Sequence, residues 1–187
     1  MKKCEITGTL PEPMGDMPAV VWKEGLYVFG GGTADEVRQD IYRIDVSGSQ
    51  VEKVGKMPFR SRGHSAVLVE DRVYLLGGFD EGTLPHAYCY DLATGRPEKL
   101  PDMPQDSAWF SAASKDRKLY VVGGFSIPSG YWKDMVVYDM DKGSWEKYED
   151  SFPADIFPQR LLGSNSCLTI GDNIISFGGA DSFDRNS

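Results

Sequence analysis

Short apolar runs that each end in a pair of glycines recur four times along this chain. Their residues are mostly β-branched or aromatic and are bounded by turn-forming residues, which is typical of strands buried on both faces. The starts of successive runs are 47, 46 and 55 residues apart. A repeat of this size predicts an array of similar structural units. The four runs are Leu26–Gly31, Val73–Gly78, Leu119–Gly124 and Ile174–Gly179.

The second unit shows most clearly what one repeat contains. Its segments 65–70, 73–76, 87–90 and 96–100 predict four short strands, with a tight turn at Asp71-Arg72 between the first two. No stretch of the chain keeps a period of 3.6 residues, so we expect little helix. Four-stranded units at this spacing predict the blades of a β-propeller.

The third unit carries residues that resemble a known family. It contains Gly123-Gly124, then Tyr138-Asp139, then Trp145. This order resembles the kelch repeat, and the resemblance covers nearly the whole chain. The second unit keeps Gly77-Gly78 and Tyr90-Asp91. The departures from the pattern are Pro97 in place of the tryptophan of unit two, and Ile44 and Val51 in place of the tyrosine and tryptophan of unit one.

The resemblance implies an all-β, kelch-type β-propeller of four-stranded antiparallel blades. In such blades the tyrosine and tryptophan pack between neighbouring blades, and the glycines allow sharp turns or close backbone approach. The residues with these structural roles are Gly30, Gly31, Gly77, Gly78, Gly123, Gly124, Gly178, Gly179, Tyr90, Tyr138 and Trp145.

The repeats predict a single domain over residues 1–187 that does not end on a blade boundary. The units are 11–56, 58–102, 104–151 and a partial fourth at 153–187, with 3–9 as a lone outer strand. Three complete blades and a partial one suggest a fragment of a larger ring, or a short chain that closes by forming a homo-oligomer through unpaired blade edges. A closed four-bladed ring is the alternative.

Composition limits which binding partners and which cellular compartment we expect for this protein. The net charge of −8 argues against nucleic acid, and no apolar run is long enough to span a membrane. The first residues lack the apolar stretch of a signal peptide. Three cysteines at unrelated positions (Cys4, Cys89 and Cys167) favour free thiols in a reducing compartment, so we expect a cytoplasmic protein.

The sequence shows no established catalytic or metal-binding motif. The only histidines are His64 and His86, and no spacing resembles a zinc site. His64 fits a structural position at the start of a strand. Tyr88-Cys89-Tyr90 has residues that copper-containing propeller oxidases use, but Tyr90 is assigned to packing between blades. We therefore predict no catalytic residue, no metal and no cofactor.

One face of the predicted ring collects the longest and most aromatic loops. In kelch-like rings the connections from strand two to strand three share a face with the connections between blades, and loops on a rigid scaffold often carry binding residues. Arginine pairs well with carboxylates, and tryptophan, tyrosine and arginine are frequent binding hot spots. The predicted ligand- or partner-binding residues are Arg60, Arg62, Trp109, Phe110, Tyr131, Trp132 and Arg160.

The leading hypothesis for the function is a non-enzymatic kelch-type scaffold, which presents the arginine and aromatic loop face to an acidic peptide or protein segment. The second reading is an enzyme, because the chain also resembles, more loosely, kelch-type sialic acid mutarotases and epimerases, which hold an acidic sugar in the central opening. Glu81, Asp106 or Asp155 would then transfer protons. A third reading is an assembly unit of a split propeller.

Overall fold

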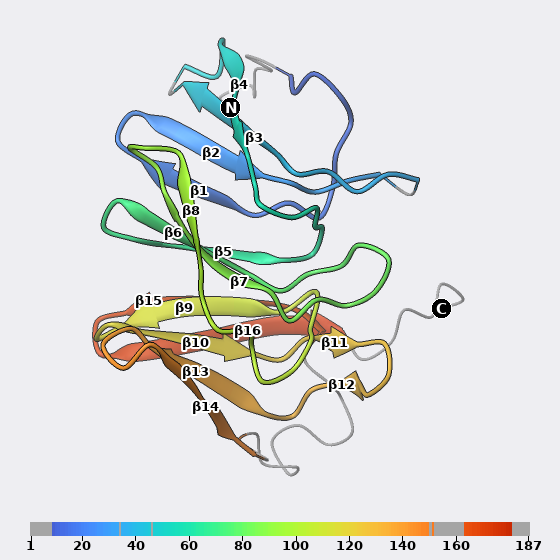
Figure 1. Ribbon diagram of the computed structural model, residues 1–187, viewed down its shortest axis with the longest axis vertical. Coiled ribbons are helices and arrows are strands. Elements are labelled where there is room, and N and C mark those ends of the chain that lie inside the picture. Colours follow the sequence, from blue (N-terminus) through green and yellow to red (C-terminus); the bar gives the residue numbers. More distant parts are fainter. Residues whose placement is uncertain (1–8, 34, 46, 150, 152–162, 181–187) are drawn as a thin grey trace, which may run out of the picture.

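The structure, a computed structural model, describes residues 9–33, 35–45, 47–149, 151 and 163–180. The secondary-structure elements of these residues are all β-strands, and the strands pair into antiparallel sheets (Figure 1). This part of the chain contains no helix that could cross a membrane. The predicted all-β fold class is confirmed.

Three four-stranded sheets form complete blades. Blade one contains β1 (Ala19–Trp22), β2 (Gly25–Phe29), β3 (Asp40–Asp45) and β4 (Val51–Lys56). Blade two contains β5 (Ser65–Val69), β6 (Arg72–Leu76), β7 (Ala87–Asp91) and β8 (Arg96–Lys99). Blade three contains β9 (Ser111–Lys115), β10 (Lys118–Val122), β13 (Met135–Asp139) and β14 (Ser144–Tyr148). The strands of each blade pair in chain order, and the hairpin β11 (Phe125–Ser126) and β12 (Gly130–Tyr131) lies between β10 and β13.

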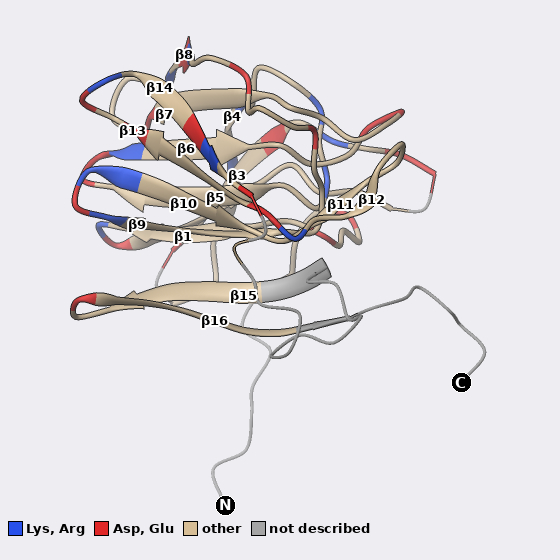
Figure 2. Ribbon diagram, turned by 90° about the horizontal axis from the view of Figure 1, so that it is seen from below, with Lys and Arg blue, Asp and Glu red and all other residues tan. Residues whose placement is uncertain are grey.

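The partial fourth blade is a hairpin of β15 (Gly163–Ile170) and β16 (Asn173–Ala180), the two inner strands that the sequence predicts. The hydroxyl of Thr169 donates to the carbonyl oxygen of Ser114 at 2.8 Å, which places β15 beside β9. Figure 2 shows the hairpin as a layer next to the inner strands of the complete blades. No ladder among the described residues joins it to blade one, so ring closure is not seen. The predicted outer strand at 3–9 falls outside these residues, except for Thr9, which is not in a strand.

Two apolar cores fill the spaces between the blades. Side chains of successive strand residues point to opposite faces. Leu75 of β6 therefore packs with Phe29 and Ile41 between blades one and two, whereas Leu76 packs with Leu119 between blades two and three. This double burial explains why the second strand of blade two is apolar at consecutive positions. The prediction that all four runs are buried on both faces is wrong for β16, where Ile175 and Phe177 are exposed.

The glycine pair after β6 shows why each repeat needs small residues there. Gly77 and Gly78 both have positive φ angles, 59° and 102°. A Cβ atom at Gly77 would lie 2.6 Å from the carbonyl oxygen of Ser107 and 2.7 Å from the ring of Phe110. The pair lets the next inter-blade segment pack directly on the backbone. The fourth pair differs, because Gly178-Gly179 lies inside β16 and does not follow it.

The aromatic residues of the repeat pattern lie between blades. Tyr90 is 5% exposed and belongs to the core between blades one and two. Tyr138 is 4% exposed and belongs to the core between blades two and three. Trp145 is half-buried, with its ring centroid 5.0 Å from that of Tyr138, and its indole N–H donates to the carbonyl oxygen of Pro101 at 2.8 Å. The tryptophan thus holds the linker that leads into blade three.

The aspartate that ends the third strand of each blade closes the following turn. Asp91 accepts backbone N–H bonds from Ala93 and Thr94, and Asp139 accepts the equivalent bonds from Asp141 and Lys142. The bond from Lys142 is the main cause that lowers the pKa of Asp139 below its usual 3.8. This is the side chain–backbone bonding that aspartate commonly makes in turns.

One predicted turn is displaced by a residue. The turn between the first two strands of blade two is at Glu70-Asp71, because Arg72 pairs with Val69 and with Asp91 and therefore belongs to β6. Glu70 makes this possible by adopting a left-handed backbone with φ of 57°.

Candidate functional site

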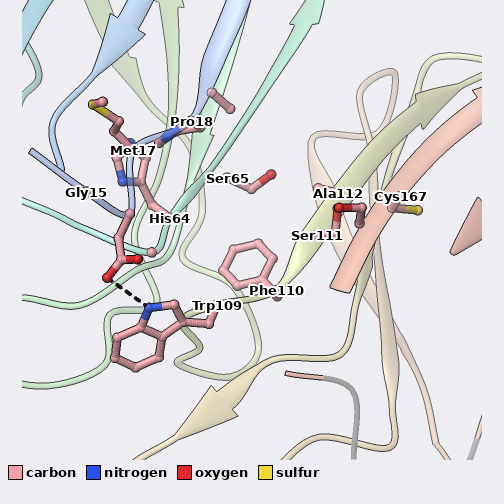
Figure 3. A pocket seen from close by; sticks show the side chains of 14 residues that line it. Gly15, Met17, Pro18, His64, Ser65, Trp109, Phe110, Ser111, Ala112 and Cys167 are labelled. Atoms are coloured by element: carbon pink, nitrogen blue, oxygen red, sulfur yellow. Dashed lines mark hydrogen bonds between the residues drawn. The ribbon is translucent and has the colours of Figure 1, made fainter. Parts of the chain in front are cut away.

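Corresponding segments of the three complete repeats meet around one cavity. They are Gly15–Pro18, Gly63–Ala66 and Trp109–Ala112, in which Asp16, Gly63 and Trp109 are equivalent positions, 47 and 46 residues apart in sequence. Together with Ser166 and Cys167 of β15, they line a cavity of about 600 Å³ (Figure 3). We call this cavity the central channel. It lies at the beginning of the inner strands β1, β5 and β9, so the repeat itself places these residues side by side.

A chain of backbone hydrogen bonds runs around the mouth of the channel. The N–H of Gly63 donates to the carbonyl oxygen of Asp16, and the N–H of Trp109 donates to that of Gly63, both at 2.7 Å. These three residues occupy one repeat position and all have left-handed backbones, with φ of 53°, 61° and 53°. A non-glycine residue in this conformation is held there by its surroundings, at a cost of about 1 kcal/mol or more. The backbone at the mouth is therefore strained at Asp16 and Trp109, and the surrounding contacts hold it in this conformation.

The side chain of Trp109 lines the channel beside Asp16. Its indole N–H donates to a carboxylate oxygen of Asp16 at 3.4 Å, the bond drawn in Figure 3. The indole lies so close to Gly63 that a Cβ atom there would be 2.8 Å from its nitrogen. Trp109 thus joins the first and third repeats across the second.

His64 lies in the wall of the channel but is buried, with 5% of its surface exposed. Neither ring nitrogen has a hydrogen-bond partner among the described residues, and the ring packs edge-on against Phe59. Burial lowers the pKa of His64 from 6.5 to about 3. The imidazole is therefore neutral near neutral pH.

Four aromatic rings form a continuous row across the loop face, here called the aromatic row. Phe79 and Trp109 have ring centroids 5.6 Å apart, Trp109 and Phe125 6.5 Å, and Phe125 and Tyr131 5.2 Å. The guanidinium carbon of Arg62 lies 5.3 Å from the centroid of Phe79 and extends the row at one end. Each of these side chains is half-buried, so each also presents surface to solvent.

Backbone bridges between loops position the row. Phe79 directly follows Gly77-Gly78, and its N–H and carbonyl group both bond to Arg62, at 2.8 and 3.0 Å. Phe125 directly follows Gly123-Gly124 and makes the equivalent pair of bonds with Ala108, both at 2.9 Å. The residue after each glycine pair is thus fixed against the preceding inter-blade segment. In blades two and three the two loop types therefore lie side by side.

The two described arginines of the predicted site differ in their charge partners. Arg60 forms an ion pair with Asp80 at 3.0 Å. Arg62 donates from Nη1 to the carbonyl oxygen of Thr33 at 2.8 Å and forms no salt bridge with any described carboxylate. Its Nε is buried without a hydrogen-bond partner among these residues. Arg62 therefore places a positive charge beside the aromatic row without an ion-pair partner among the described carboxylates.

Asp106 ties together the loops that carry the row. It accepts hydrogen bonds from the hydroxyl of Thr83 and, at 2.9 Å, from that of Ser126, which is fully buried. The hydroxyl oxygen of Thr83 in turn accepts a hydrogen bond from the backbone N–H of Ile127 at 3.2 Å. These bonds hold the hairpin β11–β12 against the loop of blade two.

The structure brings Arg62, Trp109 and Tyr131 together but separates the other predicted site residues. Phe110 is 6% exposed and packs in the core between blades two and three. Trp132 is half-buried, with the Nζ of Lys147 5.4 Å from its ring centroid and no partner for its indole N–H among the described residues. Arg160 lies outside the described residues.

The residues considered for enzymatic chemistry do not converge. Glu81, Asp106, Arg60 and Arg62 are all absent from the described lining of the central channel, and Asp155 lies outside the described residues. Cys89 is buried, which raises its pKa, and Cys167 is likewise a free thiol. Across the described ranges, no group of three or more His, Cys, Asp or Glu side chains could hold a metal ion.

Phe79 and Phe125 are the binding candidates that sequence reasoning missed. Both stand immediately after a glycine pair, at equivalent positions of units two and three. That placement was a usable signal, because a residue fixed by two glycines in successive blades must reappear on the same face.

These blades and loops define a propeller of the kelch class, and comparison with known proteins places the chain within it. The model of the KLHDC2/KLHL20/DRC7 Kelch-repeats domain matches residues 1–186, so the chain belongs to this kelch-repeat family. Kelch-repeat domains generally serve as protein-interaction scaffolds and bind proteins. Protein tag-53 of Caenorhabditis elegans is 28% identical over 105 residues, which cover 47% of this chain and only 8% of that relative.

Proposed function

We propose that this protein is a non-enzymatic binding module whose loop face holds an acidic peptide or protein segment. The central observation is the position of Arg62, an arginine without a described carboxylate partner at one end of a row of four half-buried aromatic rings. Arginine forms paired hydrogen bonds with a carboxylate, and neighbouring aromatic side chains supply apolar contact area.

The rigidity of the face supports this proposal. Its rings are carried by loops that are bridged backbone to backbone and tied through Asp106. A pre-formed surface loses little conformational freedom when a partner binds, so more of the contact energy appears as affinity. The acidic sugar reading receives less support, because Arg60 and Arg62 do not line the central channel.

The test is a selection from a random peptide library displayed on phage, followed by affinity measurements on purified peptides. We expect the selected peptides to be rich in Asp and Glu together with apolar residues. Arg62→Ala should weaken their binding roughly tenfold or more, since truncating one member of a buried charged pair costs at least that much. Affinity should also fall as salt is added.

Arg43→Ala is the matched control, because Arg43 lies on β3 and pairs with Glu52 at 3.2 Å away from the loop face. Its peptide affinities should equal those of the unaltered chain. Selected peptides without acidic residues, or peptides whose affinity survives Arg62→Ala, would remove the proposal.

A second candidate function is assembly with another copy through β16. This strand carries no charged residue, and Ile175 and Phe177 are 41% and 51% exposed on it. The outer strands β4, β8 and β14 instead carry lysine, arginine or glutamate, and β8 also carries a proline. Charges and prolines are what proteins place on edges to prevent pairing, and Figure 2 shows charge on the hairpin only near its turn.

Sedimentation over a range of concentrations tests this assembly. We expect the protein to self-associate and Phe177→Lys to remain monomeric, because a lysine on the edge opposes strand pairing. Tyr148→Lys is the control, since Tyr148 is similarly exposed, at 44%, on the charged strand β14. A protein that stays monomeric at every concentration, or a Tyr148→Lys variant that dissociates equally, contradicts the candidate.

A further inference from the structure

The central channel has a charge pattern of its own, distinct from the arginine at the loop face. Asp16 is the one carboxylate among its described lining residues, and this lining includes no lysine or arginine. His64 adds no charge near neutral pH, because burial lowers its pKa to about 3. In a protein with a net charge of −8, a channel of this composition attracts cations and repels anions.

The remaining lining groups suit a cation carried on an apolar stem. Met17, Pro18 and Phe110 provide apolar wall, while the hydroxyls of Ser65 and Ser111 accept hydrogen bonds from N–H donors (Figure 3). The indole of Trp109 adds an aromatic ring next to the carboxylate of Asp16, to which it is hydrogen-bonded. Aromatic rings attract ammonium and guanidinium groups.

We propose that the central channel binds the side chain of a lysine or arginine from a protein partner, with the cation at Asp16 and Trp109 and the methylene stem along the apolar wall. A cavity of about 600 Å³ has room for such a side chain. The site goes beyond the proposed acidic-segment function and does not rest on it, because it uses Asp16 and the channel wall instead of Arg62.

The chain contains a second indole–carboxylate pair outside the channel, and the ammonium group of Lys23 already lies 3.9 Å from the centroid of its indole ring. The indole N–H of Trp22 donates to Asp71 at 2.8 Å, and neither residue is among the channel lining. The Trp22 indole signal therefore reports general effects of the added salt or amine on a tryptophan outside the channel, at a ring that already has a cation beside it.

The test is a titration of the 15N-labelled protein, followed through the indole N–H signals of Trp109 and Trp22. The probes are n-butylammonium, N-acetyl-lysine methylamide and, as an anion control, acetate. We expect both cations to shift the Trp109 signal in a saturable way, with little effect on Trp22 or from acetate. Asp16→Asn should weaken binding roughly fivefold, the magnitude of a partly exposed ion pair, and Asp71→Asn should leave it unchanged.

Three outcomes would overturn the assignment: no saturable shift with either cation, equal shifts at Trp109 and Trp22, or unchanged binding in Asp16→Asn. The two cations also distinguish the source of the ligand. Tighter binding of the peptide-borne lysine supports a protein side chain. Tighter binding of n-butylammonium overturns the assignment to a protein partner in favour of a free amine.

Discussion

The backbone N–H of Trp109 donates to the carbonyl oxygen of Gly63 at 2.7 Å, although the two residues are 46 positions apart. Both occupy the same position of their repeats and both have a left-handed backbone. The indole of Trp109 lies against Gly63, which has no side chain to exclude it. This contact joins the mouth of the central channel to the aromatic row, because Trp109 belongs to both.

Gly63→Ala should destabilise the protein and disturb Trp109. The new methyl group would be 2.8 Å from the indole nitrogen, and alanine would also have to adopt φ of 61°. The left-handed conformation costs about 1–2 kcal/mol for a residue with a Cβ, and we expect the clash to add to that. Urea unfolding measures the loss, and tryptophan fluorescence reports the displaced indole.

Gly130→Ala separates the two contributions to that loss. Gly130 also has a positive φ, 76°, but no atom lies within 4 Å of a Cβ placed there. This variant should therefore show only the conformational cost. If Gly63→Ala were no less stable than Gly130→Ala, the packing of Trp109 on Gly63 would contribute nothing.

His64→Leu should flatten the dependence of stability on pH in the weakly acidic range. In the folded protein burial holds the pKa of His64 near 3, whereas in the unfolded chain it is near 6.5. As the pH falls below 6.5 the unfolded chain binds a proton that the folded chain does not. The free energy of unfolding then decreases by about 1.4 kcal/mol per pH unit.

Urea unfolding at about pH 7 and about pH 5 measures this slope with limited interference from carboxylates. Phe59→Leu is the control, because Phe59 packs against His64 but does not titrate. That variant should lose similar stability at both pH values and keep the slope. A His64→Leu protein with the full slope would show that another group causes it.

Asp139→Asn should weaken the protein more at neutral than at acidic pH. The N–H groups of Lys142 and Asp141 hold the pKa of Asp139 below 3.8 in the folded state, which favours folding with the carboxylate ionised. That stabilisation is complete above the unfolded pKa and is lost as the pH falls through the folded one. Unfolding curves measured above and below this range should converge for Asp139→Asn and the unaltered chain. Asp172→Asn, at a fully exposed carboxylate, serves as the control.

Asp106→Ala should release the hairpin β11–β12 from the loop of blade two. The buried hydroxyl of Ser126 would lose its acceptor, which costs about 1–3 kcal/mol. Hydrogen exchange should become faster in residues 125–131, with smaller changes elsewhere. Asp80→Ala offers a comparison, since the exposed Arg60–Asp80 pair should contribute at most about 1 kcal/mol. Equal effects of the two variants would contradict the network.

Much of the fold could be predicted from periodicity, since Gly77-Gly78 and Gly123-Gly124 mark strand ends that local residue preferences also support. The site was harder to predict. Arg62, Trp109 and Tyr131 were recognised as binding residue types, but Phe79 and Phe125, which join them into a row, were not. Phe110, next to Trp109 in sequence, lies in the core, because the left-handed backbone at Trp109 breaks the regular alternation of side chains just before β9 begins.

The repeat length and the four-stranded unit follow from residue order alone, because the pairing of strands within a blade depends on contacts between near neighbours in the chain. Burial on both faces of the second strand needs a blade on each side, and β16, with Ile175 and Phe177 41% and 51% exposed, does not show it. Tertiary structure decided which side chains share the loop face and the channel. Arg62 and Phe79, or Asp16 and Trp109, meet only after the blades have stacked. No local preference encodes such contacts, because they depend on how one blade is turned and displaced against the next.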